Sequence, residues 1–222
     1  MEQLTGTHSS PTCRLPDYWK MASQIWVDTI SQMCVNFDYQ DAPWEYLERT
    51  NSAILAGCLS AAGASAMPET YVMRNGQENQ QAKRVDICLV TRSSGNTVLE
   101  LVECKQAEYD SSKSNTYLQI QSKLNAATKQ VSDITGIHGI QLAHKGGIVN
   151  RTSVVFGLPC FQPEPITSIA SRAEAIQKII NDLQINSGIA LAAWCFPREY
   201  SGRLSIRYKK YYPGTFLVVK AV

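Results

Sequence analysis

The sequence lacks three features that would place it in a broad class at once: a long hydrophobic run, a strong net charge and a paired cysteine motif. No stretch of about eighteen consecutive apolar residues occurs, so we expect no membrane-spanning helix, and the polar residues 1–16 do not have the pattern of a secretory leader. The formal net charge is only +2. Any contact with nucleic acid must therefore come from local clusters of basic residues.

The seven cysteines are an odd number, and no two of them are spaced as C-x-x-C. This usage fits buried thiols in a reducing compartment better than a disulfide framework or a zinc site, so we expect a cytoplasmic or nuclear protein. No serine or cysteine is linked by motif spacing to a histidine and an acid. The sequence therefore argues against a serine or cysteine hydrolase.

Length and periodicity predict an α/β protein with one main domain. We expect residues 1–42 to form a loose tail and a helical extension, and residues 43–222 to form the domain itself. Apolar periodicity and turn residues predict helices over about 18–37, 43–59, 115–134 and 167–185, strands near 69–74, 84–90, 97–105, 153–158 and 189–196, and a C-terminal hairpin of 203–211 with 215–222.

The clearest local signal is a β-hairpin over residues 84–105. If Ser94 and Gly95 form a two-residue turn, residue 92 pairs with 97 and 90 with 99, which sets Asp86 directly across from Glu103 on one face. Opposed residues have Cβ atoms roughly 4.5–5.5 Å apart, so the two carboxylates repel each other unless a cation lies between them. Lys105 points to the same side as Glu103, because strand side chains alternate.

Two interpretations of this group are available. The three side chains could form an exposed salt-bridge set, which contributes about 0–1 kcal/mol. The flanking residues favour a functional site instead, because Leu99 and Leu101 on one face and Val98 and Val102 on the other indicate a strand that is buried on both sides. Buried charges require partners or a metal. Oxygen ligands without sulfur or imidazole suit Mg²⁺.

Asp86, Glu103 and Lys105 resemble the motif of the PD-(D/E)xK nuclease superfamily, with Val85 in place of the motif's proline. The expected order of a helix with a glutamate, a short strand, the hairpin and another helix also fits, over roughly residues 43–160. The resemblance implies a restriction-endonuclease-like three-layer domain, in which a mixed central β-sheet is flanked by helices. It also implies that the two acids hold Mg²⁺ or Mn²⁺ and that the lysine orients or activates the attacking water.

Further site residues are suggested by the same resemblance. Glu48 is the candidate third carboxylate, with Glu45 in reserve, although both could be first-turn acids favoured by the helix dipole. Gln121, with Gln119 behind it, is a candidate polar contact on the helix after the hairpin, and the alternative is an ordinary residue of the helix flank. The backbone carbonyl of Cys104 completes the expected metal ligands: Asp86, Glu103, Cys104 and Glu48.

Basic and aromatic residues near the C-terminus could meet phosphates and bases. An edge strand blunted by lysines explains them equally well, and Lys123 and Lys129 could likewise contact the nucleic-acid backbone or simply face water. The residues near the C-terminus are Arg203, Arg207, Tyr208, Lys209, Lys210, Tyr211 and Tyr212.

The sequence as a whole predicts a Mg²⁺- or Mn²⁺-dependent endonuclease that hydrolyses phosphodiester bonds, with DNA favoured over RNA as the substrate. The alternative is a catalytically idle nuclease-fold module that binds nucleic acid or a protein. A homodimer is one option for its assembly, and no membrane partner is expected.

Overall fold

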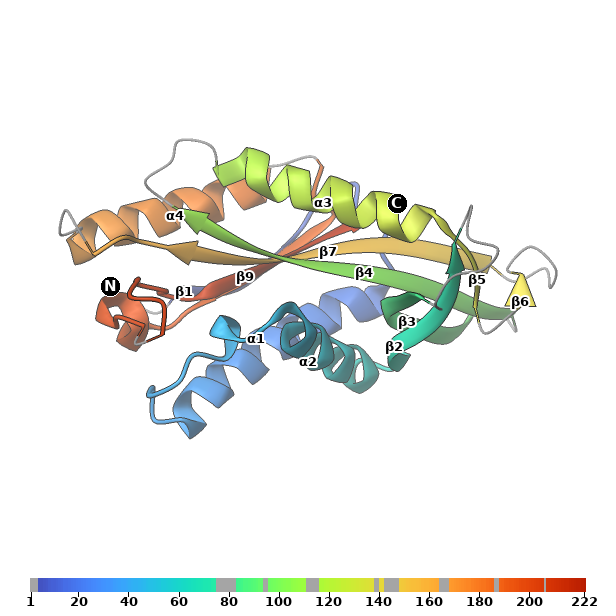
Figure 1. Cartoon of the computed structure of the whole chain (residues 1–222), viewed down its shortest axis with the longest axis horizontal. Helices are drawn as coiled ribbons and strands as arrows, with labels where there is room; N and C mark the ends of the chain where they lie inside the picture. The colour runs from blue at the N-terminus through green and yellow to red at the C-terminus, as the bar shows by residue number, and fades with distance from the viewer. Residues whose placement is uncertain are drawn as a thin grey trace.

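The computed structural model describes residues 4–74, 83–93, 96–110, 116–137, 140–141, 148–163, 168–185, 188–205 and 207–222. These residues form three layers, in which helices α1 and α2 cover one face of a β-sheet and helices α3 and α4 cover the other (Figure 1). The predicted α/β class, with a mixed sheet between helices, is confirmed at this level. No helix in the described part of the chain is long and apolar enough to cross a membrane.

The elements follow the chain in the order of their numbers. The strands are β1 (Leu4–Ser9), β2 (Ser65–Arg74), β3 (Lys83–Ser93), β4 (Asn96–Asp110), β5 (Ile134–Ile137), β6 (Ile140–Gln141), β7 (Ile148–Cys160), β8 (Leu191–Phe196) and β9 (Thr215–Ala221). The helices are α1 (Asp17–Asn36), α2 (Glu48–Ala61), α3 (Thr116–Ser132) and α4 (Ile169–Ile185), and the short 3₁₀ segments include η1 (Pro43–Glu45) and η3 (Arg198–Gly202).

The described strands join in one nine-stranded sheet in the order β1-β8-β9-β7-β4-β3-β2-β5-β6. Strands β4 and β7 pair in parallel, and the other neighbouring pairs are antiparallel. A parallel pair needs a crossover connection, and helix α3 supplies it between β4 and β7. The strand predicted at 153–158 is part of β7 and therefore lies beside the hairpin.

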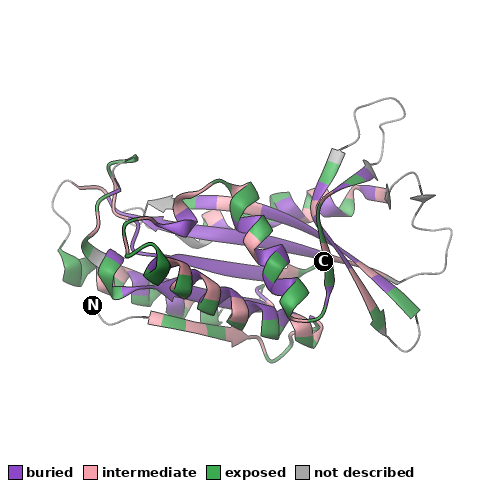
Figure 2. Ribbon diagram, turned by 90° about the horizontal axis from the view of Figure 1, so that it is seen from below, coloured by how far each residue is buried: buried purple, intermediate pink, exposed green. Residues whose placement is uncertain are grey.

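Both faces of the central strands are buried. The larger core lies between the sheet and helices α1 and α2, and it contains Trp19, Trp26, Trp44 and Leu217. On the opposite face, α4 packs over a cluster with Ile176 and Phe216, and α3 covers a smaller cluster with Leu101 and Val131. Figure 2 shows buried residues along the strands and exposed residues on the outer sides of the helices. Each fully buried aliphatic or aromatic side chain contributes roughly 1.5–3 kcal/mol.

The N-terminal part of the chain differs from the expected loose tail. Residues 4–9 form β1, which pairs with β8 at one edge of the sheet. Helix α1 lies where it was predicted, but its N-cap is Pro16, without a side-chain cap, and Asp17 is its first residue. Trp19 and Trp26 of α1 share one core cluster with Val219, so residues on both sides of the expected boundary at position 42 build the same core.

A buried carboxylate joins α1 to the sheet. Glu100 of β4 is 1% exposed. It accepts hydrogen bonds from the Trp19 indole at 2.8 Å and from the Tyr18 and Thr152 hydroxyls. These donors replace the water that the carboxylate loses on burial.

Four of the predicted elements were wrong in detail. The helix expected from residue 43 is interrupted, because Tyr46 and Leu47 are extended between η1 and α2. Apolar periodicity over 43–59 predicts an inward position for Leu47, which is instead 69% exposed. In α3 and α4, apolar periodicity likewise predicts inward positions for Leu118 and Ile169, but both side chains are exposed. The C-terminal hairpin is absent from the described residues, since Lys209 has a φ of +56° and donates to the Ser205 carbonyl in a turn, while β9 pairs with β7 and β8.

Gly157 of β7 gives a test of the packing between the central strands and α4. A Cβ at this position would lie 2.0 Å from the ring of Phe216, which is fully buried on β9. We expect Gly157→Ala to lower the free energy of unfolding by about 1–3 kcal/mol, as overpacking does. Gly57→Ala is the matched control, because no atom lies within 4 Å of its Cβ position on the exposed side of α2, and it should stabilise the chain by about 0.5–1 kcal/mol. Urea denaturation of both variants checks this, and a Gly157→Ala protein as stable as wild type would contradict the packing described.

Candidate functional site

The hairpin has the register that the sequence predicts, and its two strands separate at the expected acids. Ser93 pairs with Asn96, and the pairing of β3 with β4 continues to Ile87 and Val102. Beyond this pair, β4 extends alongside β7 to Asp110, while β3 continues along β2. Asp86 and Glu103 are therefore the next residues after the last pair of the β3–β4 ladder.

The backbone of β2 is distorted opposite Asp86. Glu69 lies between the pairs Pro68–Ile87 and Thr70–Val85, and it has a φ of +52°. Positive φ is uncommon for a residue other than glycine, and proline has no N–H to donate to a ladder. The β2–β3 ladder is thus interrupted at the level of Asp86, where β3 turns away from β4.

Two carboxylates take the place of β3 along the separated part of β4. The Cys104 N–H donates to Asp86 Oδ2 at 2.7 Å, and the Gln106 N–H donates to Glu48 Oε2 at 2.7 Å. Asp86 comes from β3 and Glu48 from the first turn of α2, so three elements meet here. The two acids satisfy backbone donors that a continuous ladder would otherwise satisfy.

Lys105 lies among these acids. Its Nζ is 3.3 Å from Glu103 Oε1 and 3.7 Å from Glu48 Oε1, and the side chains of Lys105 and Glu103 are 18% and 6% exposed. Burial lowers the pKa of Lys105, but Glu103, Glu48 and Asp86 outweigh burial, so the net pKa is raised above its usual value. Lys105 is consequently an ammonium at neutral pH, able to donate hydrogen bonds and unable to act as a base.

Cys104 presents its backbone to the site and its sulfur to the core. Its side chain is fully buried in the cluster beneath α1 and α2. Burial, followed by the nearby Asp86 and Glu103 carboxylates, raises the pKa of the thiol, which therefore stays neutral. Because the N–H and C=O of a strand residue point to the same edge, the Cys104 carbonyl faces the gap beside Asp86.

Gln106 and Asn51 support the site and were not predicted as site residues. The Asn51 amide donates to Gln106 Oε1 at 2.9 Å, and Gln106 Nε2 donates to the Tyr46 carbonyl at 3.1 Å. Asn51 is 2% exposed. A buried amide needs a hydrogen-bonding partner, so Asn51 within the apolar stripe of α2 was the signal in the sequence that could have identified this contact.

Glu45, the reserve carboxylate, lies in a different environment. It contacts Arg203 at 3.2 Å and accepts a hydrogen bond from the Ser205 hydroxyl at 2.6 Å. The extended residues 46 and 47 separate η1 from α2, so Glu45 and Glu48 do not share one helix. Of these two acids, Glu48 is the one that contacts Lys105.

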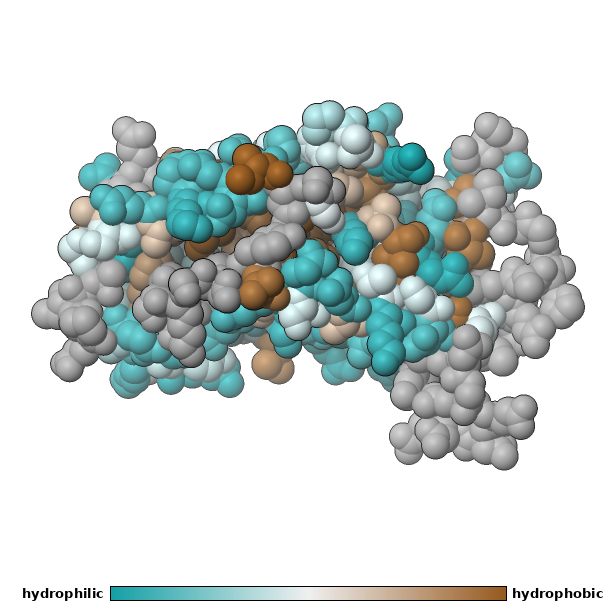
Figure 3. Space-filling view, turned by 90° about the horizontal axis from the view of Figure 1, so that it is seen from above, coloured by the Kyte–Doolittle hydropathy of each residue, from teal (hydrophilic) through white to brown (hydrophobic). Residues whose placement is uncertain are grey.

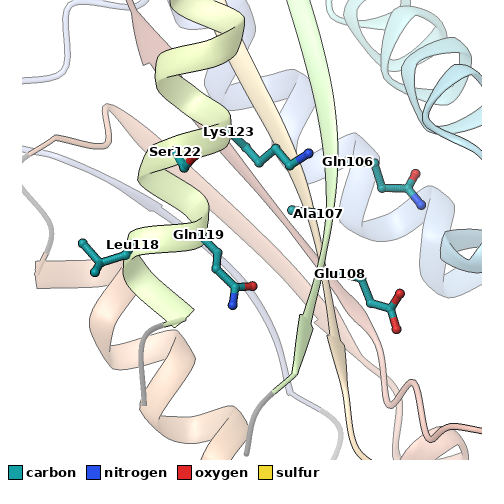
Figure 4. Close-up of a pocket in the computed structure, with 7 residues that line it drawn as sticks. All are labelled: Gln106, Ala107, Glu108, Leu118, Gln119, Ser122 and Lys123. Atoms are coloured by element: carbon teal, nitrogen blue, oxygen red, sulfur yellow. The ribbon is translucent and has the colours of Figure 1, made fainter. Parts of the chain in front are cut away.

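Gln121 and Gln119 of α3 have different surroundings. Gln121 donates to Asn125, one helical turn further on, at 2.8 Å. Gln119 and Lys123 line a cavity of about 420 Å³ beside β4, together with residues 106–108. Figure 4 shows that Gln119 and Lys123 extend from α3 toward β4, whereas Gln106 and Glu108 project from the other side of the strand. The proposed contact of Gln121 with substrate stays a prediction.

A second cavity of about 350 Å³ leads to Asp86 itself. Its lining comes from α2, β2 and β3, and it consists of Arg49, Ser52, Ala53, Pro68, Glu69 and Asp86. Asp86, which lines this cavity, also accepts the hydrogen bond from the Cys104 N–H of β4 and so links the cavity to the separated part of the hairpin.

Several of the basic residues near the C-terminus bind acids of this chain. Arg203 pairs with Glu45, and Lys210 lies 2.5 Å from Glu108. Arg207 lies over the ring of Tyr208 at 5.0 Å. On the face that carries α3 and α4, the described surface is mainly hydrophilic with separate hydrophobic residues (Figure 3). Contact of these basic residues with nucleic acid remains a prediction.

The donor set at the gap suits a magnesium ion in its chemistry. The carboxylates of Asp86, Glu48 and Glu103 and the backbone carbonyl of Cys104 are oxygen ligands of the type that Mg²⁺ prefers. Among the described residues, no group of three or more His, Cys, Asp and Glu side chains is arranged to hold a metal. Mg²⁺ commonly uses one or two protein carboxylates and completes its shell with waters and phosphate oxygens, so a larger group is not required.

The placement of Glu48 predicts a measurable effect on Lys105. Glu48→Gln removes one of the carboxylates that raise the Lys105 pKa, so this pKa should fall, whereas Glu45→Gln should leave it unchanged. The ¹³Cε shift of Lys105, followed from about pH 8 to about pH 12, reports this pKa. Equal titration curves for both variants would mean that Glu48 does not face Lys105.

The site thus combines three carboxylates and one ammonium at the edge of β4 with a cavity beside Asp86. Comparison of the chain with protein-family models, with curated proteins and with solved structures found no significant match. What the chain does must therefore be inferred from these residues and their geometry.

Proposed function

We propose that this chain is a Mg²⁺- or Mn²⁺-dependent nuclease that hydrolyses phosphodiester bonds of nucleic acid, with DNA favoured as substrate and internal cleavage favoured over cleavage from an end. The observation that carries the proposal is the meeting of Asp86, Glu48 and Glu103 around Lys105, from three separate elements. Acidic side chains gathered with one lysine in a partly buried gap are typical of sites that bind a cation and a phosphate together.

The order of the elements supports the resemblance to the PD-(D/E)xK superfamily. Helix α2 with Glu48 is followed by β2, the β3–β4 hairpin, α3 and then β7 beside β4. This is the order that the resemblance implies for a restriction-endonuclease-like domain, and the acids and the lysine lie at the expected places within it. Membership in that superfamily is part of the proposal.

Asp86, Glu103 and the Cys104 carbonyl would hold the metal, and Glu48 would contact it directly or through water. When bound, the ion supplies positive charge to the scissile phosphate and lowers the pKa of a bound water. Lys105, kept protonated by its acidic neighbours, would donate to the attacking water and offset negative charge on the phosphate. Asn51 and Gln106 would hold Glu48 and β4 in register during the reaction.

The competing interpretation is an idle nuclease-fold module that only binds nucleic acid or a protein. The close set of Asp86, Glu103 and Lys105 favours an enzyme, because buried like charges are costly and a binding module gains nothing from them. Incubation of plasmid, linear and single-stranded DNA and of RNA, with and without Mg²⁺ or Mn²⁺, separates the two. Metal-dependent cleavage is expected, and binding without cleavage in every condition would favour the idle module.

Metal binding should stabilise the folded chain. If the ion binds only the native state, a hundredfold excess over Kd contributes about 2.7 kcal/mol, which corresponds to several degrees in Tm for a chain of this size. Asp86→Asn should abolish the rise while keeping a hydrogen-bond acceptor for the Cys104 N–H. Asp182→Asn on the exposed side of α4 is the control and should leave the rise unchanged. Identical melting curves with and without millimolar Mg²⁺ and Mn²⁺ would argue against a metal site.

Loss of Lys105 should affect chemistry more than folding. We expect Lys105→Ala to fold, to retain the metal-dependent rise in Tm and to cleave at least about a hundredfold more slowly, which is the scale for a positioned catalytic group. Lys178→Ala, which removes an exposed lysine of α4, should cleave like wild type. Wild-type rates for Lys105→Ala would show that the assigned role is wrong.

A further inference from the structure

The cavity that leads to Asp86 is bordered by a compact group of charges. Glu69 contacts the guanidinium groups of both Arg49, on α2, and Arg84, on β3. The Arg84–Glu69 distance is 2.5 Å, and Arg84 also donates to the Tyr71 hydroxyl at 2.8 Å while lying over the Tyr71 ring at 4.7 Å. Two guanidinium groups are thus held by one carboxylate, which leaves the group with a net charge of about +1 at neutral pH.

Both arginines have an ion-pair partner and are still open to solvent. The side chains of Arg49 and Arg84 are 75% and 45% exposed. Arg49 is next to Glu48 on α2, and Arg84 precedes Asp86 by two residues on β3. Each arginine therefore belongs to an element that also supplies a carboxylate of the site. The pair therefore lies next to the gap and does not depend on a separate loop for its position.

The backbone is strained at Glu69, the residue whose carboxylate contacts both arginines. Its φ of +52° is in the left-handed region, where a residue with a Cβ costs about 1 kcal/mol or more. The distortion occurs opposite Asp86, beside the cavity that both residues line. Strained residues persist where the surrounding structure fixes them, and they concentrate at functional sites.

We propose that Arg49 and Arg84, positioned by Glu69, bind an internal backbone phosphate of the nucleic-acid strand, adjacent to the phosphate that is cleaved. The assignment of a nucleic-acid strand as the ligand rests on the proposed nuclease function. Guanidinium groups match phosphate oxygens through paired hydrogen bonds, and arginine is the side chain best suited to this contact.

The charge of the catalytic gap gives a reason for such a pair. Asp86, Glu48 and Glu103 face a single lysine there, so a polyanion that approaches the gap is repelled. A second site of positive charge beside Asp86 offsets this repulsion and holds the nucleic-acid strand along the cavity. Lys105 cannot serve this purpose alone, because Glu103 and Glu48 already lie within 3.7 Å of it.

The test measures binding without cleavage. Fluorescence anisotropy of a labelled DNA strand, in EDTA and at several salt concentrations, gives Kd and its salt dependence for the full chain. Arg49→Gln and Arg84→Gln should each raise Kd about three- to tenfold and reduce the slope of log K against log salt by about one, as loss of one phosphate contact does. Arg84→Lys should restore the slope but only part of the affinity, because it keeps the charge and loses the paired donors.

Lys178→Gln is the matched control, since Lys178 is 76% exposed and paired with Asp182, much as Arg49 is exposed and paired with Glu69. It should bind like wild type. Melting curves confirm that each variant is folded. Unlabelled circular single-stranded DNA should compete with the probe, because it has internal phosphates and no ends, and competition only by linear 5′-phosphorylated DNA would overturn the internal assignment.

The two proposals can fail separately. If wild type cleaves nucleic acid while Arg49→Gln and Arg84→Gln bind like Lys178→Gln, the phosphate pair is wrong and the nuclease function stands. If binding depends on both arginines but no substrate is cleaved with Mg²⁺ or Mn²⁺, the nuclease function is wrong and the phosphate pair stands. If wild type neither binds nor cleaves, both are wrong.

Discussion

The separation of β3 from β4 at Asp86 is the structural feature on which the site depends. Where the ladder ends, the Cys104 and Gln106 N–H groups still need acceptors, and the Asp86 and Glu48 carboxylates provide them. These bonds bring acids from β3 and α2 to one edge of β4, next to Glu103 and Lys105. The same contacts therefore complete the sheet and assemble the charged group. An uninterrupted hairpin would satisfy the backbone equally well but would leave no gap between β3 and β4.

Sequence patterns predicted the hairpin most accurately, because the alternation of side chains and the two-residue turn together define one register. They also predicted the positions of α1, α3, α4, β7 and β8 to within a few residues. Patterns failed where long-range contacts decide the structure. The strand at residues 4–9 forms because β8 offers an edge, and the C-terminal segment turns at Lys209 although its sequence alternates. Neither cause lies within the local sequence.

The candidate site was also predictable only in part. Asp86, Glu103 and Lys105 lie on one hairpin, so period and register bring them together. The sequence already favoured Glu48 over Glu45, but it did not predict the break at Tyr46 and Leu47 that separates the two acids, because neither of these positions carries a helix-breaking residue. Asn51, a polar residue in the apolar stripe of α2, was a signal for its contact with Gln106, whereas the distortion at Glu69 became visible only in the three-dimensional structure. The function itself remains a proposal, because geometry indicates the type of chemistry and experiments must show it.

The bond from the Gln106 N–H to Glu48 has a consequence for the order in which the chain folds. The two residues are 58 positions apart in sequence, and the entropy of closing such a loop must be overcome before the contact forms. The hairpin, by contrast, closes through neighbouring residues and can form early. A partly folded chain would then carry Asp86, Glu103 and Lys105 on the hairpin without the helix that completes the charged group. The contact of Glu48 with Lys105 would form only after α2 docks, so the complete group of charges would belong to the finished fold alone.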